Sequence, residues 1–366
     1  MKILKKITTR YIKSLIYDAI SYSPRYSKLF GIYTRAIAVD QITDSVNIAK
    51  VEDSQGKIFL SQEVSGNILI SEATGVSLIE DGDIFKGIFD YTGKIHRNWV
   101  RPSICRRTKT IDGLVINLLG VHKGYRHFFH IFFDYIFPLL YFIEGSKEKR
   151  NIKILVRENL TNVQSEVYQA ISENFDNLEF VAIKKGDYVK CQRLIYINHY
   201  HQAFYDFDRN PQVKSSLLLM RKLLIARYNI KKDTSNGKLI YIARKARLRK
   251  VWNHRKFQKM LENSGFETRY LEGASLKEQV EIFFNAKKLV AVHGAALTNL
   301  IFANTDTDFS FIELYPKRKA FRKDFYRISK ILSLKRLEYV EDNEYFWESF
   351  YVNLSRFKEV LKKLID

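Results

Sequence analysis

Short apolar runs alternate with amphipathic stretches along most of the chain, and this alternation predicts a protein of mixed strands and helices. Between residues 111 and 232 we expect strands at 114–118, 152–156, 178–183 and 193–197. Stretches with helical spacing occur at 128–142, 161–174 and 211–228. Strands that alternate with helices are typical of a parallel sheet, so this region is expected to form one α/β unit.

A polar stretch, KKDTSNGK at 231–238, is rich in turn-forming residues and is the best linker in the chain. A second series of elements follows it. We expect strands at 239–243, 267–271, 289–292 and 309–314, and helices at 255–263 and 276–286. In the second helix, Leu276, Val280, Phe283 and Phe284 fall on one apolar face. This region is predicted to be a second α/β unit.

The two ends of the chain have patterns of their own. Residues 37–99 show short alternating runs separated by glycines, which is typical of β-hairpins. We therefore divide the chain into a basic amphipathic segment (1–30), a β-rich region (31–110), two α/β lobes (111–232 and 233–335) and a carboxyl-terminal helix (336–366). The last assignment rests on helical spacing of apolar residues between Trp347 and Leu361.

The formal net charge of +21 favours an anionic partner: nucleic acid, a membrane surface, or substrates such as nucleotide sugars. Charge alone does not choose among these classes, and solubility explains part of it. No run of eighteen apolar residues occurs, which argues against a membrane-spanning helix. The start lacks a secretory pattern, so we expect a cytoplasmic protein. Its basic first segment either lies at the inner membrane face or docks on the protein body. Cys105 and Cys191 are too isolated for a disulfide framework or a zinc site.

The run LVAVHGAALTNLIF at 289–302 predicts an anion site. An apolar strand ends at His293, and the small residues Gly294, Ala295 and Ala296 allow close approach of the backbone. A helix from Leu297 would then present free amides, and such a helix start favours phosphate.

Several cations follow the strand expected at 239–243. Arg244 and Arg249, with Asn253, project from one loop at a strand end. The guanidinium fork bonds two phosphate oxygens at once, so this loop is expected to assist the anion site. The alternative is a basic turn that faces solvent.

These motifs, in this order, resemble glycosyltransferase family 61, which includes plant β-1,2-xylosyltransferases, animal O-linked N-acetylglucosaminyltransferases and bacterial polysaccharide enzymes. The resemblance rests on Arg244 with RKVWN at 249–253, on residues 275–302, on FIELYP at 311–316 and on HIFFDYIFPLL at 130–140. It implies a GT-B architecture: two Rossmann-like lobes with a central cleft, the first binding the acceptor and the second the nucleotide sugar. It also implies inverting transfer. Ala296 and His254 depart from the family pattern, which commonly has a glycine and an acidic residue there.

Sugar transfer from a nucleoside diphosphate places charge on the leaving phosphate, which needs hydrogen-bond donors or a metal ion. No convincing Asp-x-Asp loop occurs, so we expect a metal-independent enzyme without a cofactor. The amides of Ala295 to Leu297 would share the leaving charge with the two arginines. His293 would bind phosphate or orient the turn.

Other residues divide between chemistry and structure. His130 and Asp134 are four apart on a helix and could act as base and orienting partner, although a buried structural pair is the alternative. Glu313 could accept hydrogen bonds from a ribose. Thr298 and Asn299 contact the donor or satisfy the turn.

We therefore expect an inverting glycosyltransferase of surface polysaccharide synthesis, with a carbohydrate or lipid-linked acceptor. The alternatives are a basic nucleic-acid-binding protein without catalysis and an inactive relative that still binds nucleotide. Nucleic acid is disfavoured because no recognisable binding module appears.

Overall fold

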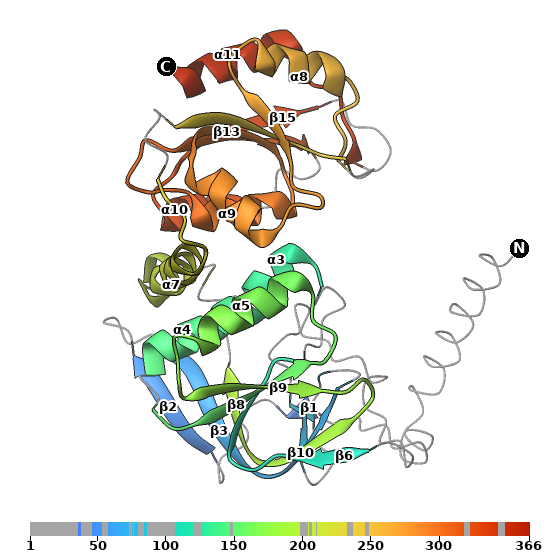
Figure 1. Cartoon of the computed structure of the whole chain (residues 1–366), viewed down its shortest axis with the longest axis vertical. Helices are drawn as coiled ribbons and strands as arrows, with labels where there is room; N and C mark the ends of the chain where they lie inside the picture. Colours follow the sequence, from blue (N-terminus) through green and yellow to red (C-terminus); the bar gives the residue numbers. More distant parts are fainter. Residues whose placement is uncertain are drawn as a thin grey trace, which may run out of the picture.

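Two β-sheets, with helices packed between and around them, make up the molecule (Figure 1). The structure is a computed structural model. It describes residues 36–37, 46–52, 58–72, 75, 77–79, 84–85, 107–119, 126–146, 149–197, 204, 207–209, 211–232, 237–245, 249–317, 323–342 and 348–366. The expected amphipathic segment at residues 1–30 lies outside these ranges.

The first sheet has ten strands, and the half that ends at β9 is parallel as predicted. Strands β10 (Tyr188–Ile197), β7 (Leu114–Asn117), β8 (Ile152–Arg157) and β9 (Leu178–Ile183) are neighbours in that order, all parallel. Helix α5 (Asn162–Ser172) connects β8 to β9 and begins with a capping box at Thr161. This half of the sheet is the first α/β unit.

Strands from the amino-terminal third join the same sheet. Strand β3 (Ile58–Ser71) pairs antiparallel with β10, and β2 (Val46–Glu52) and β4 (Ser77–Ile79) pair with β3. The remaining short strands are β1 (Ala36–Ile37), β5 (Ile84–Phe85) and β6 (Thr108–Thr110). Residues 31–110 therefore contribute strands to the sheet of the first α/β unit.

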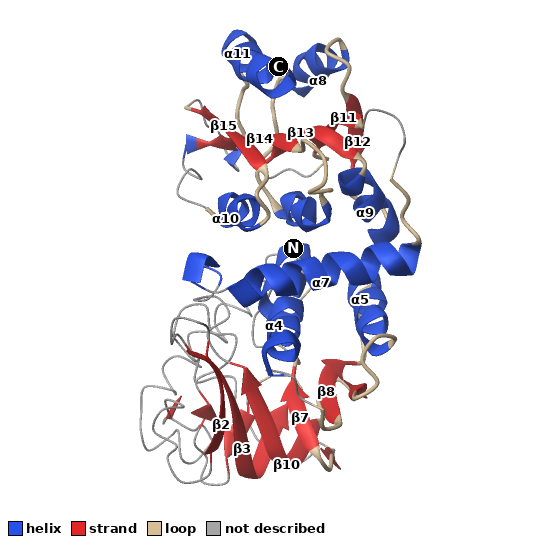
Figure 2. Ribbon diagram, turned by 90° about the vertical axis from the view of Figure 1, so that its left-hand side faces the viewer, coloured by secondary structure: helices blue, strands red, loops and turns tan. Residues whose placement is uncertain are grey.

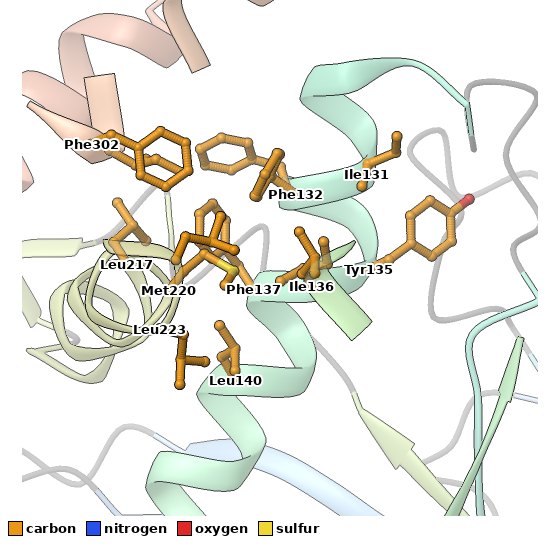
Figure 3. Close-up of a cluster of buried hydrophobic side chains, with 14 of the residues drawn as sticks. Ile131, Phe132, Tyr135, Ile136, Phe137, Leu140, Leu217, Met220, Leu223 and Phe302 are labelled. Atoms are coloured by element: carbon orange, nitrogen blue, oxygen red, sulfur yellow. The ribbon is translucent and has the colours of Figure 1, made fainter. Parts of the chain in front are cut away.

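One long helix crosses the interior of the molecule. It consists of α3 (Phe128–His130), the π-helical segment η3 (Ile131–Ile136) and α4 (Phe137–Ser146). Of the described helices it alone is long and apolar enough to cross a membrane, but 67% of its most apolar window is buried inside the protein. Its apolar side chains pack on helix α7 (Pro211–Tyr228). Figure 3 shows this contact, with Phe132, Ile136, Phe137 and Leu140 of the long helix beside Leu217, Met220 and Leu223 of α7.

The second sheet consists of five parallel strands in the order β12-β11-β13-β14-β15. The strands are β11 (Lys238–Ala243), β12 (Glu267–Tyr270), β13 (Ala286–Val292), β14 (Ser310–Pro316) and β15 (Lys335–Glu341). Helices α8 (His254–Glu262) and α11 (Leu354–Ile365) cover one face, and α9 (Leu276–Phe284) and α10 (Asp324–Ile331) cover the face towards the first unit (Figure 2). The predicted alternation of strands and helices is confirmed here.

The predicted carboxyl-terminal helix at 336–366 is wrong in its first half. Residues 335–341 form strand β15, and the helix begins only at Leu354. Phe350 and Val352 are buried while Tyr351 between them is exposed, which is the alternation of an extended segment. Phe357, Leu361 and Leu364 are buried at helical spacing. The sequence prediction thus combined the alternating pattern of an extended segment and the helical pattern of α11 into one helix.

Among the described residues, one of three hydrophobic core clusters runs through both units, and the other two lie within one unit each. The ring of Phe132 lies 6.2 Å from that of Phe302 in the second unit, and Phe129 lies 6.0 Å from Phe325. These contacts place the start of the long helix against α10 and against the segment that follows strand β13.

Candidate functional site

The bend after strand β13 is built around Gly294. Its φ of 158° and ψ of −177° lie in a region that is essentially restricted to glycine. A Cβ added here would lie 2.1 Å from Nη1 of Arg244 and 3.5 Å from Nη1 of Arg249. The backbone at Gly294 is therefore closely approached, as expected, and the groups that approach it are the side chains of Arg244 and Arg249.

The segment after the bend is a 3-10 helix, η5 (Ala295–Phe302), and this corrects the predicted set of phosphate donors. The amide of Leu297 donates to the carbonyl of Gly294 at 2.9 Å, so it is already used. Within the described residues, the amides of Ala295 and Ala296 donate to no backbone carbonyl, and both residues are partly exposed. These two amides are the ones that can receive an anion.

Thr298 and Asn299 are fully buried, and their contact with the donor stays a prediction. The side-chain amide of Asn299 donates to Oε1 of Gln279 at 3.0 Å and to the carbonyl of Ala296 at 3.1 Å. Asn299 therefore fixes η5 on helix α9, which is the structural alternative.

Arg244 and Arg249 converge on the carbonyl oxygen of His293, at 3.5 Å and 3.1 Å from their Nη1 atoms. Arg249 has a φ of 57°, a left-handed conformation that is uncommon outside glycine. Nε of Arg249 lies 3.6 Å from a carboxylate oxygen of Glu348. Burial, and then the charge of Arg249, lowers the pKa of Arg244. Two half-buried guanidinium groups side by side repel each other, and a bound anion would relieve that repulsion.

The side chain of Asn253, which was expected to bind the donor, is hydrogen-bonded to another part of the chain, and its contact with the donor stays a prediction. Its side chain donates to the carbonyl of Val352 at 2.8 Å and accepts from the amide of Val352 at 3.0 Å. The amide of Trp252 also donates to the carbonyl of Phe350 at 2.9 Å. Asn253 thus ties the loop that carries Arg249 to the segment before α11.

The ring of His293 is held in place by the buried carboxylate of Glu313, which also pairs with Arg336. Its Nδ1 lies 2.6 Å from Oε1 of Glu313, and Oε2 of Glu313 lies 2.7 Å from Nε of Arg336. Glu313 is 1% exposed and sits inside strand β14, and the expected bond to a ribose stays a prediction. Nothing in the local sequence marks Arg336, which reaches Glu313 because β15 lies beside β14.

His130 and Asp134 form the predicted pair in the first unit. Nδ1 of His130 lies 2.7 Å from Oδ2 of Asp134, and the side chains are 22% and 2% exposed. Asp134 lies in the π-helical segment, where the amide of Phe137 donates to the carbonyl of Phe132. Single π-helical turns occur frequently at functional sites. His130 is thus the member that can meet a substrate.

His127 belongs to the site and was missed by the sequence analysis. Its ring lies 5.1 Å from that of His130. It keeps an exposed surface, yet partial desolvation lowers its pKa first, and the charges of His130, Arg249 and Arg244 lower it further. Its position three residues before His130, on the same side of a helix start, was the available signal.

The site as a whole brings basic groups from both units around one bend. Arg244, Arg249 and the amides of Ala295 and Ala296 come from the second unit, and His127 and His130 from the first. In the described part of the chain, no three His, Cys, Asp or Glu side chains gather as a metal site. The arrangement can bind an anion and take up a proton beside it.

In a comparison with protein families, the model of the family Glycosyltransferase 61 matches residues 128–309. This range, about half of the chain, contains His130, Asp134, both arginines and the bend at His293. His127, Glu313 and Arg336 lie outside it. None of the curated proteins matches the chain.

Proposed function

Because this chain belongs to glycosyltransferase family 61, we propose that it transfers a sugar from a nucleotide-diphosphate donor to a carbohydrate or lipid-linked acceptor, with inversion at the anomeric carbon. Family membership makes the chain a glycosyltransferase that acts on a sugar donor and an acceptor. The observation that carries the finer proposal is the convergence of Arg244 and Arg249 on the carbonyl of His293. A diphosphate is the part of such a donor that matches paired guanidinium groups.

The bend would stabilise the leaving diphosphate. As the bond from the anomeric carbon to the phosphate oxygen breaks, its electron pair stays on that oxygen. Arg244, Arg249 and the amides of Ala295 and Ala296 then receive the developing charge. Donors already in place cost little reorganisation during the reaction. Two fixed cations supply what a metal ion would supply elsewhere, so we propose a metal-independent reaction.

His130 would act as the general base. Asp134 holds Nδ1 of His130, so Nε2 is the ring atom that would take the proton of the acceptor hydroxyl. The proton moves to Nε2 as the acceptor oxygen bonds to the anomeric carbon from the face opposite the leaving phosphate. Asp134 is 2% exposed and would orient the ring and stabilise its charged form. One displacement of this kind inverts the configuration.

The wider setting extends the proposal. We propose a GT-B arrangement in which residues 111–232 bind the acceptor and residues 233–335 bind the nucleotide sugar. The basic segment at residues 1–30 would contact the inner membrane face, where a lipid-linked glycan is accessible to a cytoplasmic enzyme. The net charge of +21 is consistent with both an anionic donor and an anionic surface.

A two-stage experiment tests the function. A thermal-shift screen of the full chain against nucleotide sugars should raise the melting temperature for the true donor, since ligand binding stabilises the folded state. That donor is then incubated with glycan and lipid-linked acceptors, with and without EDTA. NMR of the product should show an inverted linkage formed equally well in EDTA. A retained configuration would refute the inverting mechanism, and loss of activity in EDTA that is restored by a divalent ion would refute metal independence.

A further inference from the structure

A pair of exposed aromatic rings lies next to the arginine loop. Trp252 and Tyr351 are 52% and 45% exposed, and their rings are stacked with centroids 6.4 Å apart and an interplanar angle of 15°. Large aromatic side chains are usually buried, and an exposed stacked pair offers a ready surface for another flat ring.

The pair is held rigidly in place. Val251 and Phe350, one residue before each ring, are buried and form a parallel bridge. The amide of Trp252 donates to the carbonyl of Phe350, and the side chain of Asn253 makes two hydrogen bonds to the backbone of Val352. The rings therefore do not need to be ordered when a ligand arrives, which lowers the entropic cost of binding.

The same two segments carry the groups of the anion site. Arg249 lies three residues before Trp252, and Glu348, its ion-pair partner, lies three residues before Tyr351. Both residues adopt left-handed conformations, with φ of 57° and 58°. Each segment therefore turns sharply just before it extends, so that a charged side chain and an aromatic side chain are presented by one short stretch.

The orientation of the bound donor indicates which part of it would reach Trp252 and Tyr351. Trp252 lies just before Asn253, the N-cap of α8, and α8 lies on the opposite side of the second sheet from α3 (Figure 1). In the function proposed above, the transferred sugar faces His130 at the start of α3. A donor held by its diphosphate at His293 must then extend its nucleoside the other way, along the carboxyl edge of the sheet.

We infer that Trp252 and Tyr351 form a platform on which the nucleobase of the donor stacks. This inference rests on the proposed function. Stacking of a base on an aromatic side chain contributes about 1–3 kcal/mol and tolerates different bases, because every base has a flat face. The platform would strengthen binding of nucleotide donors, and edge contacts elsewhere would choose the base.

Calorimetry with two ligands tests the inference. A nucleoside diphosphate has a base, whereas inorganic pyrophosphate offers only the part that the arginines bind. For the double variant Trp252→Ala/Tyr351→Ala, the affinity for the nucleoside diphosphate should fall roughly 5- to 150-fold, with pyrophosphate affinity unchanged. Trp252→Phe should keep most of the affinity because a flat ring remains. Ile365→Ala, which truncates another exposed apolar side chain, is the matched control.

Two results would overturn the platform. One is an unchanged nucleoside diphosphate affinity in the double variant. If only the KM of the acceptor rises in that variant, the rings bind the acceptor instead. The other is an equal loss for both ligands, which would show that the rings only support the loop. A wild-type chain that binds neither ligand would instead refute the proposed function together with this inference.

Discussion

Replacing Gly294 with alanine should separate the stability of the bend from its function. The new Cβ would meet Nη1 of Arg244 at 2.1 Å, and the backbone there has a φ of 158°. Two costs follow. Backbone strain in this region is worth about 1–3 kcal/mol, which lowers the melting temperature. The guanidinium of Arg244 is the far end of a flexible side chain, so it will move aside rather than disrupt the fold.

The displaced guanidinium determines the effect on binding. A hydrogen bond to a charged group contributes about 1.5–3 kcal/mol, so the affinity for a nucleoside diphosphate should fall roughly 10- to 150-fold. The assay is titration calorimetry of Gly294→Ala, Arg244→Ala and the double variant. Because both substitutions remove the same contact, the double variant should bind about as weakly as Arg244→Ala alone.

Gly113 provides the matched control. It has a φ of 90°, and a Cβ there would meet nothing within 4 Å. Gly113→Ala should therefore lower the melting temperature and leave nucleotide affinity unchanged. Two results would refute the reasoning that Gly294 is needed to let Arg244 approach the bend. One is a wild-type nucleoside diphosphate affinity in Gly294→Ala, and the other is fully additive losses of affinity in the double variant.

Four further outcomes are expected. Arg249→Ala should weaken nucleoside diphosphate binding by about 1–3 kcal/mol in calorimetry, because a charge-assisted contact is lost. Asp134→Asn should lower kcat for transfer with little change in donor affinity, since the partner of the base is lost. Glu313→Gln should lower donor affinity and turnover in a folded protein, because Arg336 then faces an uncharged amide and the ring of His293 loses its carboxylate. Diphosphate binding should be coupled to proton uptake by His127, so that affinity rises as pH falls.

The sign of the pH effect follows from the surroundings of His127. In the free protein, desolvation and the charges of His130, Arg249 and Arg244 lower its pKa, opposed by Asp134. A bound diphosphate favours the charged ring and raises that pKa. Affinity should therefore increase below the pKa of the complex and level off below that of the free protein. Calorimetry in buffers of different ionisation enthalpy measures the uptake. His127→Asn corrects for titration of the phosphate itself, and equal uptake in that variant would exclude His127.

The other expectations have controls and refutations of their own. Arg255→Ala, an exposed arginine on α8, should bind nucleotide normally. Wild-type transfer rates in Asp134→Asn would remove the acid from the mechanism. Arg336→Lys keeps the charge opposite Glu313 and should retain more activity than Arg336→Ala. Indistinguishable Arg336 variants would show that its charge does not position His293.

The sequence predicted the alternation of the second unit because its strands are apolar runs and its helices have one apolar face. Strand β15, KRLEYVE, carries charged residues at several positions and was missed for that reason. The bend at His293 and the two arginines were found from residue type and spacing. The strand containing Glu313 was recognised, but a local pattern does not show depth, so its burial and its bond to Arg336 could not be predicted. The hydrogen bonds between Asn253 and the backbone of Val352 could not be predicted either, because Val352 lies far along the chain.

The hydrophobic core that joins the two units limits how the enzyme can move. Phe129 and Phe132 enter the second unit beside Phe325 and Phe302, so pulling the sheets apart would expose large apolar rings to water. Substrates must then reach the site through local rearrangement of the segments around it, rather than through a wide hinge opening between the two units. For the same reason, heat should melt both halves in one cooperative transition, and a mutation deep in either half will weaken the other.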